Sequence, residues 1–310
     1  MVTKSPSLII RLGIWVLFLG LGLGATEFVA GRYFGFGKPV VYEAHPLYGY
    51  RPLPHQDLIR FGGAHLAFNN KGLRADQDWD ANPKGKILFL GDSVTYGGSY
   101  IGNTELFSHI ASTIAFPHFQ NGNAGVNAWG VLNVQALVQA CDFTPAEIYV
   151  LTFPEGDFYR GTTRLPGQPF WARHPRFALE ELALYALYQL NLYRYDVPDI
   201  HHNPIEAQRV AQDAANKLKG LQDSLTQKGF KVIIYLTPTQ GQALGNDPKD
   251  PYVLQALKTA GVTYTHLLDK VQKSDPIVSW YCDSVHLTKA GHAQWGQWIA
   301  EDLKKHLTHS

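Results

Sequence analysis

The chain has 310 residues, 45% of them hydrophobic, so it can bury a sizeable core in one large domain or two small ones. Its formal net charge of +1 excludes the strongly basic surface of most nucleic-acid-binding proteins. With only two cysteines, Cys141 and Cys282, the sequence has neither a disulfide scaffold nor a cysteine-based metal cluster. One bridge between them and two separate thiols are both compatible with the sequence. We expect no metal, no other cofactor and no nucleic-acid partner.

The N-terminus has the pattern of a membrane segment. Lys4 and Arg11 precede an uncharged run over residues 12–25, and apolar residues extend this run to position 30. Residues 8–30 are long enough for a bilayer span, which needs about 20 residues. We therefore expect residues 1–31 to be an uncleaved anchor, with a cleaved signal or a buried helix as the alternatives. The positive charge before the run predicts a single-pass protein of a cell inner membrane, with the rest of the chain periplasmic or extracytoplasmic.

The next segment, residues 32–85, is rich in turn-forming residues, as in the stretch His45-Pro46-Leu47-Tyr48-Gly49-Tyr50-Arg51-Pro52. We expect a mostly irregular lead-in with a few short strands, packed on the main domain at residues 86–310.

The main domain alternates short apolar runs with helical segments. Strands are predicted at residues 87–90, from about 119 to a turn at 123–125, and at 147–151, 231–236 and 261–265. Helices are predicted at residues 103–115, 131–140, 204–228, 252–259 and 288–306. This alternation predicts an α/β fold with a largely parallel sheet and helices on both of its faces.

Residues 155–203 are too many for a simple connection between a strand and a helix. We interpret them as an insertion with a Pro-rich piece at 165–174 and a helical piece near 179–192. Long inserted loops often line a binding site. Four arginines in this region suit either an acidic substrate or a solvated face: Arg160, Arg164, Arg173 and Arg176. Trp129 and Trp171 suit either stacking on sugar rings or ordinary packing.

Polar residues follow the strands at the edge where ligands bind in parallel α/β sheets. Ser93 comes directly after the first strand, at the turn into a helix whose free backbone N–H groups can stabilise a developing oxyanion. A serine hydroxyl needs an adjacent base to become a nucleophile, and a carboxylate orients a histidine base. Asp283 and His286 lie three residues apart before the last helix, so one short turn can present both side chains.

Two segments of the sequence resemble motifs of the SGNH (GDSL-like) hydrolases. Gly91-Asp92-Ser93-Val94-Thr95-Tyr96-Gly97 is similar to the first motif, and Asp283-Ser284-Val285-His286-Leu287 to the last. Asn69-Asn70-Lys71-Gly72-Leu73-Arg74 resembles the lead-in of membrane-anchored members. The resemblance spans residues 84–308 and implies a flavodoxin-like three-layer α/β/α fold with a mainly parallel five-stranded sheet.

The same resemblance implies ester hydrolysis or acyl transfer through a serine-bound acyl intermediate. Ser93 matches the nucleophile, His286 the base and Asp283 the carboxylate that orients the base. We expect Asp92 and Asp157 to act through hydrogen bonds to neighbouring groups rather than on the substrate.

The sequence departs from the family at two of the three expected oxyanion donors, which are the positions of Ser93, Ala128 and Gly156. Ala128 occupies the place of a family glycine, where its backbone N–H can still donate, and Gly125 is the alternative if the register shifts. Gly156 occupies the place of an asparagine side chain, and losing one such donor typically costs about 2.7–4 kcal/mol of transition-state stabilisation. Two nearby asparagines are candidate substitutes: Asn123 and Asn127.

These features predict an extracytoplasmic serine esterase or O-acyltransferase that acts on acyl esters, most simply acetyl esters, of a cell-surface or exported glycan. The expected partners are this acylated glycan, or another ester substrate, and the membrane crossed by residues 8–30. A lipase or lysophospholipase is the alternative enzyme. A glycan-binding protein on a degenerate SGNH fold is the non-catalytic alternative, and it is suggested by Gly156.

Overall fold

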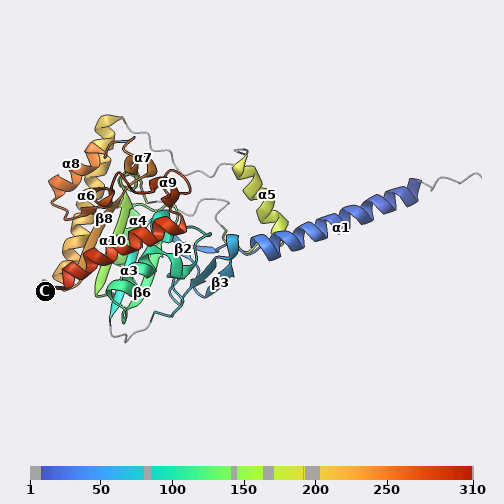
Figure 1. The fold of residues 1–310 in the computed structure, drawn as a ribbon, viewed down its shortest axis with the longest axis horizontal. Helices are drawn as coiled ribbons and strands as arrows, with labels where there is room; N and C mark the ends of the chain where they lie inside the picture. The colour runs from blue at the N-terminus through green and yellow to red at the C-terminus, as the bar shows by residue number, and fades with distance from the viewer. Residues whose placement is uncertain are drawn as a thin grey trace, which may run out of the picture.

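The computed structural model describes residues 8–79, 85–140, 145–162, 171–190, 192 and 203–308. The first element, helix α1 (Leu8–Phe34), projects away from the rest of the chain (Figure 1). It has 27 residues, and none of its most apolar 18-residue window is buried, which rules out the buried-helix alternative. A helix of this length and composition fits a signal anchor or a signal peptide.

Two antiparallel hairpins follow α1. They are formed by β1 (Tyr42–His45) with β2 (Gly49–Pro52), and by β3 (Gln56–Ile59) with β4 (His65–Phe68). Tyr50, Leu66 and Phe68 point inward and join the same buried cluster as Leu88 and Leu90 of the main sheet. The sequence predicted a mostly irregular lead-in with a few short strands, packed on the main domain, and both the short strands and the packing are present. The pairing of the strands into hairpins was not predicted, because strands of four residues are too short for a period-two pattern to reveal it.

The main sheet has five strands in the order β6-β5-β7-β8-β9, and all neighbouring strands are parallel. The strands are β5 (Lys86–Gly91), β6 (Gln120–Gly125), β7 (Ile148–Pro154), β8 (Lys231–Thr237) and β9 (Thr265–His266). Every residue of β5 and β7 is buried, as expected for central strands covered on both faces. The predicted parallel five-stranded sheet is confirmed.

Two strand boundaries in the prediction were wrong. β7 continues to Pro154, three residues beyond the predicted end, because its pairing with β8 extends to Thr237. β9 begins only at Thr265, whereas the prediction placed a strand over 261–265. Gly261 is in the left-handed region, with φ +71°, and ends helix α8 (Pro251–Ala260), so the chain is still in a helix cap there.

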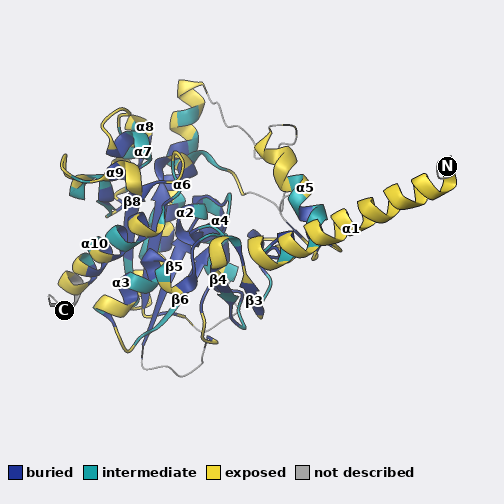
Figure 2. Ribbon diagram, turned by 45° about the vertical axis from the view of Figure 1, so that its right-hand side comes forward, coloured by how far each residue is buried: buried dark blue, intermediate teal, exposed yellow. Residues whose placement is uncertain are grey.

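Helices cover both faces of the sheet and form the outer layers of the three-layer fold (Figure 2). One face packs against α4 (Val131–Ala140), α6 (Pro204–Gln227) and α8. The other packs against α3 (Phe107–Ala115), α9 (Ile277–Trp280) and α10 (Lys289–Thr308). Short helical turns complete the described elements: α2 (Ser93–Tyr96), α7 (Gln240–Ala243), η1 (Phe61–Gly63), η2 (Asn103–Glu105), η3 (Glu155–Tyr159) and η4 (Leu267–Lys270).

The helix predicted at residues 103–115 is in fact two elements. Leu106 has extended backbone angles and separates η2 from α3. The N–H of Phe107, which starts α3, donates to Nδ1 of His292 on α10 at 3.2 Å. This contact with a residue distant in the sequence fixes where α3 begins, so local periodicity could not show the break.

Helix α5 (Ala178–Gln189) lies apart from the three layers, beside the end of α1 that joins the domain (Figure 1). It is the described helical part of the predicted insertion, and its observed bounds replace the predicted 179–192. Residues 163–170, 191 and 193–202 lie outside the described part of the chain, and Arg164 is among them. Cys141 is also outside it, while Cys282 is exposed.

Candidate active site

Ser93 is presented by a tight turn between β5 and α2. Gly91 is needed at the end of β5, because a Cβ there would lie 2.1 Å from Oγ1 of Thr95. Asp92 caps α2, and its Oδ1 accepts the N–H of Val94 at 2.9 Å. Gly97 closes the turn in the left-handed region, with φ +86°. The pattern Gly-Asp-Ser-x-x-x-Gly thus encodes a one-turn helix that starts at Ser93.

Ser93, His286 and Asp283 form a continuous chain of hydrogen bonds, which we call the triad. Nε2 of His286 lies 2.8 Å from Oγ of Ser93, and Nδ1 lies 2.7 Å from Oδ2 of Asp283. The other oxygen of Asp283 accepts the N–H groups of Val285 at 2.9 Å and His286 at 2.7 Å. The three-residue spacing therefore forms one local turn that fixes the carboxylate and the ring together.

The charges in the triad favour a carboxylate beside a basic imidazole. Burial would raise the pKa of Asp283, but hydrogen bonds from the ring and backbone of His286 outweigh burial and lower this pKa to about 2. For His286, burial alone would lower the pKa, but the hydrogen bond and charge of Asp283 raise it above its ordinary value. Asp283 is thus ionised at neutral pH and strengthens His286 as a proton acceptor.

Backbone geometry distinguishes Ala128 from Gly125, the two candidates for the second oxyanion position. The N–H of Gly125 donates to Oδ1 of Asn123 at 2.8 Å, and a Cβ at Gly125 would lie 2.3 Å from the backbone N of Tyr96. Gly125 is therefore a close-packing residue whose donor is already used. Ala128 lines the cavity beside Ser93 and has φ +61°, a left-handed conformation that favours glycine. Such backbone strain tends to persist at functional sites.

Gly156 and Asn127 line the same cavity, whereas Asn123 does not. The side-chain amide of Asn123 is buried and donates to the carbonyl of Thr95 at 2.6 Å and to Oγ of Ser108 at 2.9 Å. Of the two candidate substitutes, only Asn127 can reach the site, and its amide lies 3.2 Å from the hydroxyl of Tyr42. A Cβ at Gly156 would meet nothing within 4 Å, so the place of the family asparagine is open space.

Two buried carboxyl groups, Asp92 and Asp157, lie beneath Ser93 and share one arginine. Nη1 of Arg160 is 2.7 Å from Oδ1 of Asp157 and 3.8 Å from Oδ2 of Asp92, and it donates to the carbonyl of Trp129 at 2.8 Å. Burial raises the pKa of both acids, and Arg160 opposes that rise. Arg160 therefore supports the floor of the site. Nothing in the sequence indicated this role of Arg160 beyond the spacing of three residues between Asp157 and Arg160.

The lead-in motif also supports Ser93, through Arg74. This buried side chain donates to the carbonyls of Tyr96 and Gly98, the latter at 2.8 Å, and to Oδ1 of Asn103 at 3.0 Å. The guanidinium thus ties down the loop that leaves α2. The sequence indicated the motif but not this contact.

The triad opens into a cavity of about 670 Å³. Its floor is the edge of the sheet, and its outer walls include Trp171, which the sequence had suggested for stacking or packing. The other wall side chains were not identified from the sequence: Val40, Tyr42 and Phe61 from the lead-in, and Leu184, Tyr185 and Tyr188 from α5. Trp171 is buried in this wall, whereas Trp129 is fully buried in the core, so packing is the correct interpretation for Trp129.

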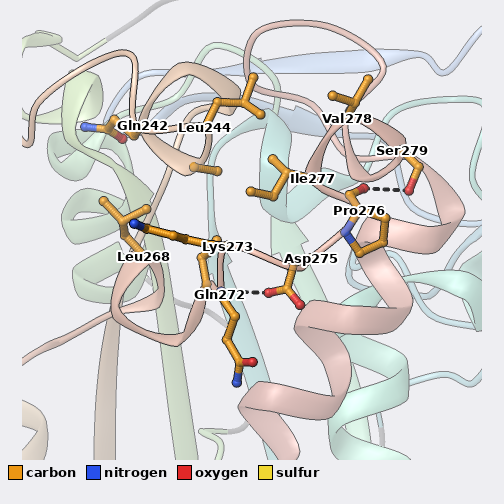
Figure 3. A pocket seen from close by; sticks show the side chains of 13 residues that line it. Gln242, Leu244, Leu268, Gln272, Lys273, Asp275, Pro276, Ile277, Val278 and Ser279 are labelled. Atoms are coloured by element: carbon orange, nitrogen blue, oxygen red, sulfur yellow. Dashed lines mark hydrogen bonds between the residues drawn. The ribbon is translucent and has the colours of Figure 1, made fainter.

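A second hollow of about 900 Å³ lies among α7, η4 and α9 (Figure 3). None of the triad lines it. Its serine, Ser279, donates its hydroxyl to the carbonyl of Pro276 at 2.7 Å, and its Asp275 accepts the N–H of Gln272 at 2.8 Å. Among the described residues, no group of three or more His, Cys, Asp or Glu side chains could hold a metal ion. The Ser93 cavity is therefore the better candidate for chemistry.

No protein-family model and no curated protein matches the sequence. Among solved structures, the fold is similar to a carbohydrate acetylesterase from Sinorhizobium meliloti, at TM-score 0.41 and 12% identity, over 71% of this chain and 98% of that chain. It is similar to a member of the lipolytic protein G-D-S-L family from Veillonella parvula, at TM-score 0.41 and 12% identity, over 70% and 96% of the two chains.

A third similar structure is a carbohydrate esterase family 2 enzyme from Corynascus thermopiles, at TM-score 0.41 and 16% identity, over 77% of this chain and 71% of that chain. These three are described as lipolytic or carbohydrate-esterase structures. At such low identity they describe an architecture, and the chemistry follows from the residues of this chain.

Proposed function

We propose that this chain is a serine ester hydrolase or O-acyltransferase that uses Ser93 as its nucleophile. The observation that carries the proposal is the unbroken chain of hydrogen bonds from Ser93 through His286 to Asp283, at 2.8 and 2.7 Å. A serine beside a histidine that is oriented by a carboxylate is the arrangement that activates a hydroxyl for attack on a carbonyl. A non-catalytic binding protein has no need of this alignment.

In the first step, Oγ of Ser93 attacks the ester carbonyl while Nε2 of His286 accepts its proton. The carbonyl oxygen becomes an oxyanion, which the backbone N–H groups of Ser93 and Ala128 stabilise. The carbon–oxygen bond of the ester then breaks, and His286 returns the proton to the departing alcohol. Water, or a sugar hydroxyl, then attacks the acyl carbon while Nε2 of His286 accepts its proton. The bond between this carbon and Oγ of Ser93 breaks, His286 returns the proton to Oγ, and the free acid or the new ester leaves.

The oxyanion is less well supported than the nucleophile in this proposal. Gly156 contributes no side-chain donor, and Asn127 is the cavity residue that can partly replace it. Ala128, the other proposed donor, has a backbone in the left-handed region, which alanine adopts only with strain. We therefore expect an active but slow enzyme rather than an inactive one.

For the substrate, we propose an acyl ester, most simply an acetyl ester, of a glycan at the cell surface or in transit to it. The support is the combination of an N-terminal apolar helix with a cavity walled by aromatic side chains, among them Trp171, Tyr185 and Tyr188. Aromatic rings of this kind can stack on sugars. A lipase or lysophospholipase is the second candidate, favoured by the apolar residues that α5 contributes to the same wall.

We also propose that α1 is retained as an anchor, with the triad on the extracytoplasmic side. Glu27, within α1, accepts the N–H groups of Ala178 at 2.6 Å and Leu179 at 2.9 Å, and so caps α5. Ala30 packs with Phe36 and Ala178 in a small buried cluster. Cleavage of a signal after position 30 would remove Glu27 and leave these N–H groups without their acceptor.

The experiment that tests this function is hydrolysis of p-nitrophenyl acetate by the full chain in detergent. Wild type should release nitrophenol, and Ser93→Ala should not exceed the background rate. Ser279→Ala is the matched control, because this serine lies in the second hollow, and its activity should equal that of wild type. Equal activity in wild type and Ser93→Ala would refute the proposal.

A further inference from the structure

Helix α5 exposes an apolar surface to solvent. From Leu182 to Leu192 the sequence contains no charged residue, yet most of the described positions in this stretch are exposed. Leu190 is 66% exposed, and Leu187 is exposed as well. A helix that is apolar on nearly all sides is normally buried in protein or lipid. This part of α5 therefore requires a covering that the chain itself does not supply among its described residues.

The two faces of α5 have different neighbours. Glu181, Leu184, Tyr185 and Tyr188 recur at helical spacing on one face, and all four line the Ser93 cavity. The opposite face, which we call the outer face, comprises Leu179, Ala183, Ala186, Leu187 and Leu190. The helix thus forms a wall with the catalytic cavity on one side and its uncovered apolar surface on the other.

The first half of α5 is held against the end of α1 and against the lead-in that follows it. Besides the cap from Glu27, the buried carboxylate of Glu181 pairs with the guanidinium of Arg60 and accepts the N–H of Gly37 at 2.6 Å. In both ribbon views α5 runs crosswise to α1 (Figures 1 and 2). If α1 crosses a bilayer, a helix crosswise to its outer end lies along the bilayer surface.

A groove of about 690 Å³ lies where α1 and α5 meet. Leu23, Phe177 and Leu179 give it an apolar lining, and Arg173 and Arg176 also line it. Arg173 is paired with Glu180 at 3.5 Å, yet its side chain remains largely exposed. Apolar side chains beside exposed arginines, next to an apolar helix, match the acyl chains and phosphates of phospholipids.

We propose that α5 is an interfacial helix that rests on the outer surface of the bilayer crossed by α1. The outer face and Phe177 enter the acyl boundary, and Arg173 and Arg176 contact lipid phosphates. Only the thickness of α5 then separates the bilayer from the Ser93 cavity. It follows that the ester substrate reaches Ser93 at the membrane surface, as an amphiphile or on a lipid carrier. This last step rests on the proposed function, whereas the docking of α5 does not.

Docking can be measured without catalysis by a fluorescent label in proteoliposomes of phosphatidylcholine and phosphatidylglycerol. The full chain, with Cys141 and Cys282 replaced by serine and with Ser93→Ala, receives an environment-sensitive dye at Leu190→Cys. Ile205→Cys is the matched control, because Ile205 is an 82% exposed apolar residue of α6, a helix that lies on the opposite side of the domain from α1 (Figure 1). The dye at position 190 should shift to the blue and be quenched by nitroxide-labelled lipid, unlike the dye at 205.

An equally water-exposed dye at both positions would overturn the docking proposal. The docking proposal would also be overturned by a dye at position 190 that is exposed to water in these vesicles but shielded from water in native membranes. That result would mean that a protein partner covers the outer face. Since the labelled chain is inactive by design, neither result depends on the proposed function.

The route of the substrate is tested by the ratio of two activities. Leu187→Gln combined with Leu190→Gln should lower hydrolysis of a long-chain p-nitrophenyl ester carried in vesicles by about tenfold, relative to hydrolysis of soluble p-nitrophenyl acetate. Ile205→Gln should leave this ratio unchanged. An unchanged ratio in the double variant would show that the substrate does not enter the cavity from the membrane surface. If the proposed function itself were wrong, wild type would show no Ser93-dependent activity on either ester.

Discussion

The nucleophile side and the oxyanion side of the site stand on neighbouring strands of one sheet, but they are stabilised in different ways. On the nucleophile side, two short local motifs, the Asp92 cap and the turn at Asp283, hold Ser93 and His286 so that their side chains meet at 2.8 Å. On the oxyanion side, Ala128 depends on a strained backbone and Gly156 contributes no side chain. In the proposed function, the nucleophile is therefore better supported by its surroundings than the oxyanion.

The largest expected effect comes from removing the base. His286→Ala should lower kcat/KM for p-nitrophenyl acetate by about 10⁴–10⁶-fold, because Oγ of Ser93 then has no proton acceptor at 2.8 Å. Steady-state kinetics of the full chain in detergent measures this loss. A decrease in kcat/KM of less than tenfold in His286→Ala would contradict the role of His286 as the base, and with it the comparison between the two sides of the site.

The next effect concerns the acid limb of the pH profile. His286 must be neutral to accept a proton, and its raised pKa places the fall of kcat/KM on acidification above the ordinary value of 6.5. Asp283→Asn removes the carboxylate that raises this pKa, so the limb should move to lower pH while kcat falls by about 10⁴-fold. A pH profile whose acid limb stays in place would contradict this role for Asp283.

The same carboxylate predicts a dependence of stability on pH. The folded pKa of Asp283, about 2, lies below its ordinary value of 3.8, so its contribution to folding is present above pH 3.8 and is lost as pH falls towards 2. Denaturant unfolding of Asp283→Asn and wild type should therefore differ at pH 7 and converge on acidification. A difference that stays constant down to pH 2 would be inconsistent with this account.

A smaller effect, and a gain, is expected on the oxyanion side. Gly156→Asn places an amide in open space within the cavity and should raise kcat by about tenfold or more. The reason is that removing one oxyanion donor from other serine hydrolases lowers kcat by about 10²–10³-fold. Gly161→Asn is the matched control, because Gly161 also has open space around its Cα but does not line the cavity. No gain beyond this control would mean that other donors, such as Asn127, already support the oxyanion fully.

The smallest effect concerns the backbone of Ala128. Ala128→Gly should raise the free energy of unfolding by about 0.5–1 kcal/mol, because glycine adopts φ +61° without strain. Ala124→Gly, in the regular strand β6, should lower it instead. Chemical denaturation compares the two variants, and a loss of stability in Ala128→Gly would argue against strain at this position.

Local patterns were sufficient to predict some elements and not others. Helix α4 has the predicted bounds, Val131–Ala140, and the buried strand β5 lies where its apolar run predicted it, because both depend on sequence-local periodicity. The break at Leu106 and the extension of β7 to Pro154 depend on partners far along the chain. Local periodicity contains no information about such partners.

The candidate site shows the same division. The residues around Ser93 and His286 could be found because each half of the triad is a short contiguous motif. The contacts of Arg74 with Gly98 and of Arg160 with Asp92 could not, since each joins segments with no shared pattern. The insertion suggested a wall of the binding site, but not which α5 side chains form it. The positive φ of Ala128 was also hidden, because alanine normally avoids this region.

The most direct test of the central claim is intact-mass spectrometry of the full chain after brief incubation with p-nitrophenyl acetate at low pH, where deacylation is slow. We predict that wild type gains the mass of one acetyl group, that peptide mapping locates it on Ser93, and that Ser93→Ala gains none. A chain that never acquires the group, or one that carries it equally in Ser93→Ala, would contradict the assignment of Ser93 as the nucleophile.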